Sequence, residues 1–146
     1  MGDPGRAGAM MIELPLDGGC LCGAVRYRIS ATPRSADYCH CRMCRRAAGA
    51  PLVARLTVAN AAFAWTRGEP AVHRSSPRAE RLFCRVCGSQ LALRDEPDYL
   101  NVTTASLDEP AAVRPRYHIW TTSRIAWCEI ADDLPRYPER RPGAAP

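Results

Sequence analysis

Cysteine is the residue type in this sequence with the most obvious capacity for chemistry, and its eight copies are grouped. Zinc prefers tetrahedral sets of thiolates, which proteins usually supply as close pairs from two parts of the chain. Seven of the cysteines fall into two pairs and one triplet, and the eighth stands alone: Cys20 and Cys22, Cys84 and Cys87, the triplet Cys39, Cys41 and Cys44, and the single Cys128. This spacing predicts metal binding.

The two pairs predict one closed structural zinc site with four thiolate ligands: Cys20, Cys22, Cys84 and Cys87. Glycines beside both pairs, including Gly19, Gly23 and Gly88, favour the tight turns that wrap a metal with backbone N–H groups. The alternative is a pair of disulfides in a secreted protein. The first 19 residues carry charges and lack the apolar run of a signal peptide, which argues against that alternative.

The triplet Cys39, Cys41 and Cys44 predicts a second zinc with an open coordination position, the arrangement of a catalytic site. The alternatives are a second structural site, closed by Cys128 or a histidine, and no metal at all. His40 lies between two ligands and should face away from them, so we expect it to be packed nearby. Cys128 lies in an apolar pattern and is expected to be a buried core thiol.

Composition excludes several mechanisms. All 20 basic residues are arginine, so chemistry that needs a Schiff-base or P-loop lysine cannot occur. The formal net charge of +5 is modest. The arginines are spread along the chain among acidic residues, with no basic stripe or interleaved aromatics, so nucleic-acid binding is not expected.

Neither a targeting segment nor a run of about 18 apolar residues is visible, so we expect a cytoplasmic chain without a membrane partner. In that reducing compartment, grouped cysteines indicate metal binding or catalysis rather than disulfides.

The elements that must position these cysteines are predicted to be mainly β strands. Thirteen prolines leave little room for long helices. Strands are expected over 24–29, 52–58, 71–74, 81–83, 90–94, 99–104 and 125–130. Short helical turns are expected over 45–50, after the triplet, and over 107–109. One domain over residues 13–138 is expected, between flexible ends over 1–12 and 139–146; Met10 or Met11 is a second candidate start.

These motifs resemble the glutathione-dependent formaldehyde-activating (GFA) family, which includes centromere protein V-like proteins. The resemblance covers roughly residues 14–138. The segments that carry it are 18–27, with Cys20-Leu21-Cys22-Gly23, then 39–50, 81–91, 118–120 and 132–135.

This resemblance implies a zinc-bound β-tent fold, made of small antiparallel sheets folded over a metal site with few short helices. It also implies two zinc ions per chain, with the same structural and catalytic ligands as above. The type activity of the family joins glutathione and formaldehyde into S-(hydroxymethyl)glutathione, formally a carbon–sulfur lyase running in reverse. We therefore expect a thiol such as glutathione and an aldehyde as partners.

Three thiolates leave a zinc ion electron-rich, so a thiolate is a more natural fourth ligand than hydroxide. Arg42, Arg45 and Arg46 are candidates to bind the carboxylates of glutathione, the alternative being solvated surface charges. The alternatives to this function are a non-catalytic protein with two structural zinc sites and, less favoured by the scattered arginines, a nucleic-acid-binding zinc module.

Overall fold

A computed structural model of the chain describes residues 12–143. Of the two ends expected to be flexible, residues 1–11, with the candidate starts Met10 and Met11, and residues 144–146 lie outside the described part of the chain. Within the described part of the expected tail, the carbonyl of Glu139 accepts a hydrogen bond of 3.0 Å from the N–H of Trp120.

The smaller of two sheets has three antiparallel strands in the order β1-β2-β5. These strands span Leu16–Gly19 (β1), Arg26–Ile29 (β2) and Phe63–Arg67 (β5). The predicted alternation in β2 is confirmed, because Tyr27 and Ile29 are buried and Arg28 is exposed. One face of this sheet therefore contributes to the core and the other meets solvent.

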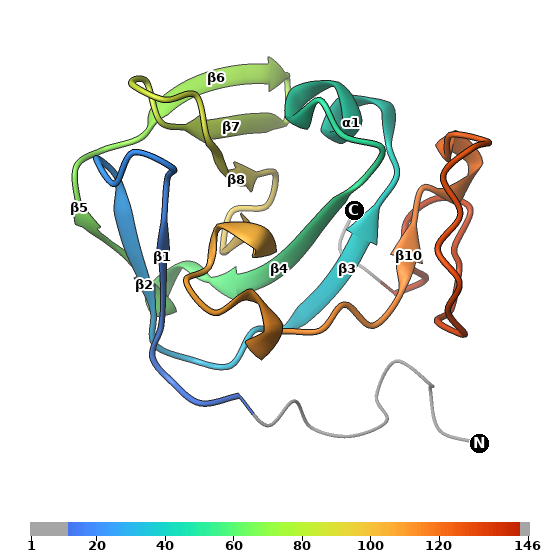
Figure 1. Cartoon of the computed structure of the whole chain (residues 1–146), viewed down its shortest axis with the longest axis horizontal. Helices are drawn as coiled ribbons and strands as arrows, with labels where there is room; N and C mark the ends of the chain where they lie inside the picture. Colours follow the sequence, from blue (N-terminus) through green and yellow to red (C-terminus); the bar gives the residue numbers. More distant parts are fainter. Residues whose placement is uncertain (1–11, 144–146) are drawn as a thin grey trace.

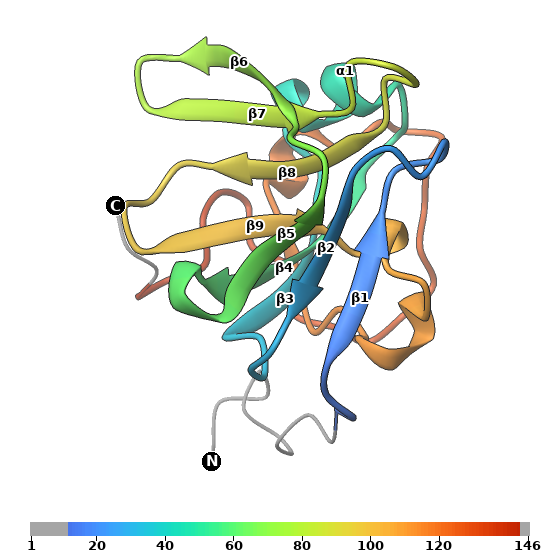
Figure 2. The same cartoon turned by 90° about the vertical axis from the view of Figure 1, so that its left-hand side faces the viewer.

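The larger sheet has seven strands in the order β10-β3-β4-β9-β8-β7-β6. Its strands in chain order are β3 (Ser35–Cys39), β4 (Val53–Ala59), β6 (Ala71–Ser76), β7 (Ala79–Phe83), β8 (Gln90–Arg94), β9 (Tyr99–Thr103) and β10 (His118–Ile119). Neighbouring strands are antiparallel except β10 and β3, which pair in parallel. The three-stranded sheet runs across the larger one (Figures 1 and 2).

The described helices are short, as predicted. The α-helix α1 spans Arg42–Ala48 and begins earlier than the expected turn over 45–50. The 3₁₀ turns are η2 (Asn60–Ala62), η3 (Thr104–Ser106), η4 (Pro110–Ala112) and η5 (Thr121–Ser123). The helical turn predicted over 107–109 is wrong, because these residues link η3 to η4. The mainly β class is confirmed.

The core joins the two sheets. Its buried side chains come from both, among them Leu16, Tyr27 and Ile29 from the smaller sheet and Leu56 and Val102 from the larger. Full burial of one such side chain stabilises the fold by about 1.5–3 kcal/mol. The Tyr27 hydroxyl lies 2.6 Å from the Ser106 hydroxyl, so its polar end is satisfied inside the core.

The strand predicted over 125–130 is wrong, and so is the burial of Cys128. The apolar residues of this segment lie in a loop, where Trp127 is 75% exposed and Cys128 is half-buried, outside the core. The guanidinium of Arg124 donates to the carbonyls of Ile125, Ala126 and Cys128. Backbone groups that would otherwise pair in a sheet are satisfied within this loop.

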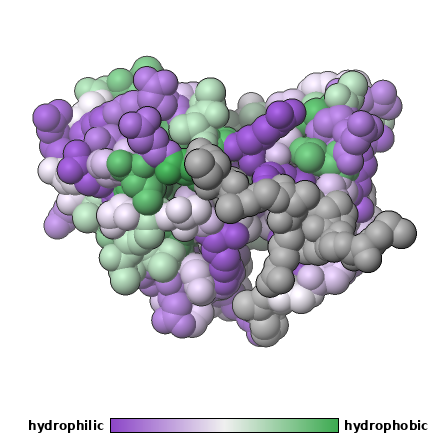
Figure 3. Space-filling view, turned by 90° about the horizontal axis from the view of Figure 1, so that it is seen from below, coloured by the Kyte–Doolittle hydropathy of each residue, from purple (hydrophilic) through white to green (hydrophobic). Residues whose placement is uncertain are grey.

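Hydrophilic and hydrophobic residues are interspersed on the face drawn in Figure 3, where hydrophobic residues form separate patches. Among residues 12–143, no helix has both the length and the apolar character needed to cross a bilayer.

Candidate functional site

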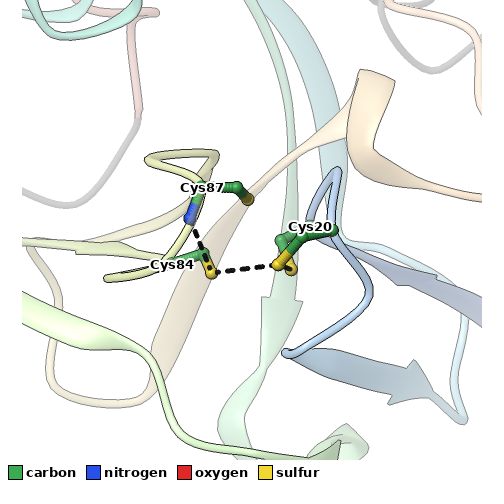
Figure 4. Close-up of side chains that lie close together, drawn as sticks. Cys20, Cys84 and Cys87 are labelled. Carbon is green, nitrogen blue, oxygen red and sulfur yellow. Dashed lines mark hydrogen bonds between the residues drawn. The ribbon is translucent and has the colours of Figure 1, made fainter.

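The four cysteines of the two pairs come together between the two sheets. Cys20 and Cys22 occupy the turn between β1 and β2, and Cys84 and Cys87 occupy the turn between β7 and β8. Their sulfurs all lie within 4.8 Å of one another. The Sγ atoms of Cys20 and Cys22 are 3.6 Å apart, and those of Cys22 and Cys84 are 3.8 Å apart. Figure 4 shows Cys20 facing Cys84 and Cys87 from the opposite turn.

Polar groups in the same turns contact these sulfurs. The N–H of Val25 donates to Cys20 Sγ at 3.2 Å, and the N–H of Cys87 donates to Cys84 Sγ at 3.5 Å. Hydrogen bonds from the hydroxyl and the backbone of Ser89 lower the pKa of Cys87 to about 5. N–H and O–H donors favour the thiolate form, the form that ligates metal.

The triplet forms a second cluster at the junction of β3 and α1. Cys39 ends β3, Cys41 caps the helix in an extended conformation, and Cys44 lies in the first turn of α1. Their three sulfurs also lie within 4.8 Å of one another. The N–H of Cys44 donates to Cys41 Sγ at 3.3 Å, as in a helix N-cap. Extended backbone puts Cys39 and Cys41 on the same face, and the helical turn adds the third sulfur.

Crowding within the triplet separates the acidities of its thiols. Hydrogen bonds from Cys39 and Cys44 lower the pKa of Cys41 to about 2, and the same contacts raise the pKa of Cys39. One member is thus held as a thiolate, the form that ligates metal.

Both clusters fit zinc by the chemistry of their donors. Each offers only sulfur, and three or four thiolates within one coordination shell are the donor sets of zinc sites. No histidine or carboxylate within the described residues joins either set. The two clusters can therefore hold one zinc ion each.

The triplet opens onto a cavity of about 460 Å³, whose lining includes Cys39, Cys41 and Cys44. Seven arginines and three acidic residues share this lining: Arg34, Arg42, Arg55, Arg78, Arg81, Arg140, Arg141, Asp37, Asp95 and Glu96. The cavity therefore carries an excess of positive charge beside the sulfurs, which favours anionic ligands.

Two of the lining arginines are paired with lining acids. Arg55 contacts both carboxylate oxygens of Asp37, at 3.2 and 3.3 Å, and both residues are largely buried. Arg34 lies 3.0 Å from Glu96. Arg42 and Arg78 have no ion pair among residues 12–143, so their charges are available to a ligand.

A buried chain of hydrogen bonds lies next to the triplet. His40 and His118 are 1% and 0% exposed, and His40 Nε2 lies 2.8 Å from His118 Nδ1. His118 Nε2 lies 2.9 Å from Asp132 Oδ2. A carboxylate accepts from Nε2–H, which makes His118 Nδ1 the acceptor of the His40 Nε2–H. This chain of hydrogen bonds fixes the imidazole of His40, the residue between Cys39 and Cys41.

All seven clustered cysteines take the predicted groupings, and His40 packs beside the triplet as expected. Among the three candidate arginines of α1, Arg42 lines the cavity and Arg45 and Arg46 do not. Sequence reasoning missed Arg55 and Arg81. One signal could have pointed to Arg81: it lies on a predicted strand, three residues before the metal-ligand candidate Cys84.

Comparison with known proteins identifies one family. Residues 15–123 match the family described as glutathione-dependent formaldehyde-activating enzyme. A Halomonas elongata protein, named provisionally as a glutathione-dependent formaldehyde-activating enzyme, is 31% identical over 128 residues, covering 79% of this chain and 80% of the relative. A crystal structure of a Rhodobacter sphaeroides protein superposes with a TM-score of 0.55 at 28% identity, covering 68% of this chain and 92% of that one. The family match contains all seven clustered cysteines and leaves Cys128 outside.

Proposed function

This chain belongs to the glutathione-dependent formaldehyde-activating enzyme family, and we propose that it is a zinc-dependent carbon–sulfur lyase-type enzyme. Its reaction is the addition of a thiol to an aldehyde, with glutathione and formaldehyde giving S-(hydroxymethyl)glutathione. The observation that carries this proposal is the three-cysteine cluster, which opens onto an arginine-rich cavity.

The two clusters take different roles in this proposal. Cys20, Cys22, Cys84 and Cys87 satisfy all four positions of a structural zinc between the two sheets. The triplet provides three ligands for the catalytic zinc and leaves one position for a ligand from the cavity. When bound there, zinc supplies a coordination position at which a thiol is held as its thiolate at neutral pH.

The cavity residues bind and orient the substrate. Glutathione carries two carboxylates, and guanidinium groups bind carboxylates through paired N–H donors. Arg42 and Arg78 line the cavity without an ion pair among residues 12–143, so they are the candidates for this contact. The Arg55 guanidinium is already paired with Asp37, so it is not a candidate for this contact.

The reaction also proceeds without a catalyst, so the test must measure an acceleration. Exchange NMR on an equilibrium mixture of glutathione and isotope-labelled formaldehyde gives the rate of adduct formation, from which the rate without protein is subtracted. We expect the zinc-loaded protein to accelerate exchange. Cys44→Ala should abolish the acceleration, because it removes one of three ligands.

Cys128→Ala is the matched control, since Cys128 lies outside both clusters. It should exchange at the wild-type rate. An undiminished rate in Cys44→Ala would contradict the proposal. Absence of acceleration in a wild-type protein with two bound zinc ions would favour the non-catalytic alternative.

A panel of thiols tests the role of the arginines. Glutathione should be accelerated more than cysteamine, a thiol that has no carboxylate, because the cavity has an excess of guanidinium groups. Equal acceleration of both thiols would contradict carboxylate binding by the cavity.

A further inference from the structure

Arg81 stands apart from the other cavity arginines because its guanidinium lies against a sulfur of the triplet. Its Nη1 and Nη2 atoms are 4.0 and 3.9 Å from Cys44 Sγ. No carboxylate within residues 12–143 forms an ion pair with Arg81, whereas Arg55 donates two hydrogen bonds to the carboxylate of Asp37. The Arg81 charge is therefore directed at the reacting end of the cavity.

The fold holds Arg81 in this position. In β7 the adjacent Leu82 is 2% exposed and belongs to the core, so Arg81 points to the opposite face, where it lines the cavity. Its backbone pairs with His73 in β6 and Leu93 in β8. The strand then leads to Cys84 in the four-cysteine cluster. The Arg81 guanidinium is thus carried by a strand that is hydrogen-bonded to a neighbouring strand on each side.

Thiol addition to an aldehyde generates negative charge at a defined atom. The thiolate sulfur forms a bond to the carbonyl carbon, the carbonyl π bond breaks, and its electron pair moves to oxygen. The resulting alkoxide then takes a proton from water to give the hydroxymethyl product. In the reverse reaction the hydroxyl loses its proton and the carbon–sulfur bond breaks. A cationic donor near this oxygen lowers the barrier in both directions.

We infer that Arg81 is a catalytic residue that donates hydrogen bonds to the developing oxyanion of the aldehyde. This inference rests on the proposed function. A guanidinium has five N–H donors in a rigid fork, so it can remain against Cys44 while it contacts a second acceptor. The cavity lining brings an entering molecule to both the triplet and this guanidinium.

The test compares Arg81→Met and Arg81→Lys with the matched control Arg74→Met. Arg74 is an exposed arginine of the neighbouring strand β6 that lies 3.8 Å from Glu80 and is not part of the cavity lining. Zinc content, kcat and KM are measured for each variant. A second readout is independent of turnover: the affinity of each protein for S-methylglutathione and for S-carboxymethylglutathione, whose added carboxylate places an oxyanion near the sulfur.

For Arg81→Met we expect two zinc ions per chain, an unchanged KM for glutathione and a loss of about 100-fold in kcat, the effect of removing one oxyanion donor. Arg81→Lys should recover part of that loss. Wild type and Arg74→Met should bind the carboxymethyl compound more tightly than the methyl compound, and Arg81→Met should lose this preference.

Three results for Arg81→Met would overturn the role of Arg81. The first is a kcat equal to that of wild type, and the second is an unchanged preference for the carboxymethyl compound. The third is that the variant loses the triplet zinc and regains full activity when zinc is supplied in excess. The last result would mean that Arg81 only balances the charge of the thiolates. A wild-type protein that fails to accelerate exchange would instead remove the proposed function itself, before the variants are compared.

Discussion

At the scale of single residues, a buried chain of hydrogen bonds from His40 through His118 to Asp132 supports the site. Both imidazoles are buried and each makes a hydrogen bond along the chain, although Nδ1 of His40 has no partner among the described residues. A buried donor or acceptor that loses its partner costs about 1–3 kcal/mol. These residues therefore hold β10, β3 and the triplet in register.

Replacing His118 with phenylalanine keeps an aromatic ring against Tyr38, which stacks on His118 at 4.9 Å, and removes both hydrogen bonds. We expect His118→Phe to lower the free energy of unfolding by about 2–4 kcal/mol, because His40 and Asp132 both lose a partner. Urea unfolding of the zinc-loaded protein measures the change.

The control for this prediction is His73→Phe, an exposed histidine in β6. Its free energy of unfolding should stay within about 0.5 kcal/mol of wild type. Equal stabilities for the two variants would show that the buried chain contributes nothing specific.

At the scale of elements, a glycine turn sets how closely β2 and β5, which are neighbours in the smaller sheet, approach each other at one end. Gly68 follows β5 with a φ of +62°, and a Cβ at this position would collide with the carbonyl oxygen of Ala24, which precedes β2. Gly49 ends α1 with nearly the same φ, +63°, and a Cβ there would meet open space. A side chain at either position would therefore strain the backbone, but only at Gly68 would it also collide with a neighbouring atom.

Gly49→Ala should lower the free energy of unfolding by about 1–2 kcal/mol, the cost of a left-handed conformation in an L-residue. Gly68→Ala should lower the free energy of unfolding by more than Gly49→Ala does, because the backbone of β2 or β5 must also shift. Thermal and urea unfolding of both variants measure this difference. A cost for Gly68→Ala no larger than that for Gly49→Ala would contradict the close approach.

The sequence predicted those elements that depend on local pattern. The alternation of Tyr27 and Ile29 predicted the buried face of β2, and cysteine spacing predicted the triplet and each pair, because such residues are close in the chain. The joining of the two pairs, whose members Cys22 and Cys84 are 62 positions apart, was predicted from the four thiolates that a closed zinc site needs.

The apolar pattern around Trp127 led to the wrong prediction of a strand over 125–130. The carbonyls of this segment accept hydrogen bonds from Arg124 rather than from a neighbouring strand.

Apart from the meeting of the two cysteine pairs, contacts between distant residues were beyond local pattern. His40 and His118 are 78 positions apart and Arg81 and Cys44 are 37 apart. Each contact follows from the order of strands in the large sheet, which no spacing rule specifies. The parallel pairing of β10 with β3 belongs to the same class.

At the scale of the whole molecule, the four-cysteine cluster ties the two sheets together. One pair belongs to the β1–β2 turn of the small sheet and the other to the β7–β8 turn of the large sheet. A structural zinc contributes its binding energy to folding, because the unfolded chain has no preformed site. The triplet, in contrast, joins β3 to the helix that directly follows it.

Loss of a ligand should therefore have different effects at the two sites. Cys84→Ser should lower Tm more than Cys44→Ser, and should raise the hydrogen-exchange rates of β1 and β2. Calorimetry and amide exchange, both with zinc in excess, measure these effects. Equal Tm values, or faster exchange confined to α1 in both variants, would contradict this division of roles.

The most direct test of the central claim is zinc titration of the metal-free protein, with the glutathione–formaldehyde exchange rate measured at each addition. Wild type and Cys44→Ala are titrated in parallel. We predict that the variant binds one zinc ion and never accelerates exchange, and that the wild-type rate rises only as the three-cysteine cluster fills. Full acceleration in the zinc-free wild type, or in Cys44→Ala with one zinc bound, would contradict the assignment of catalysis to Cys39, Cys41 and Cys44.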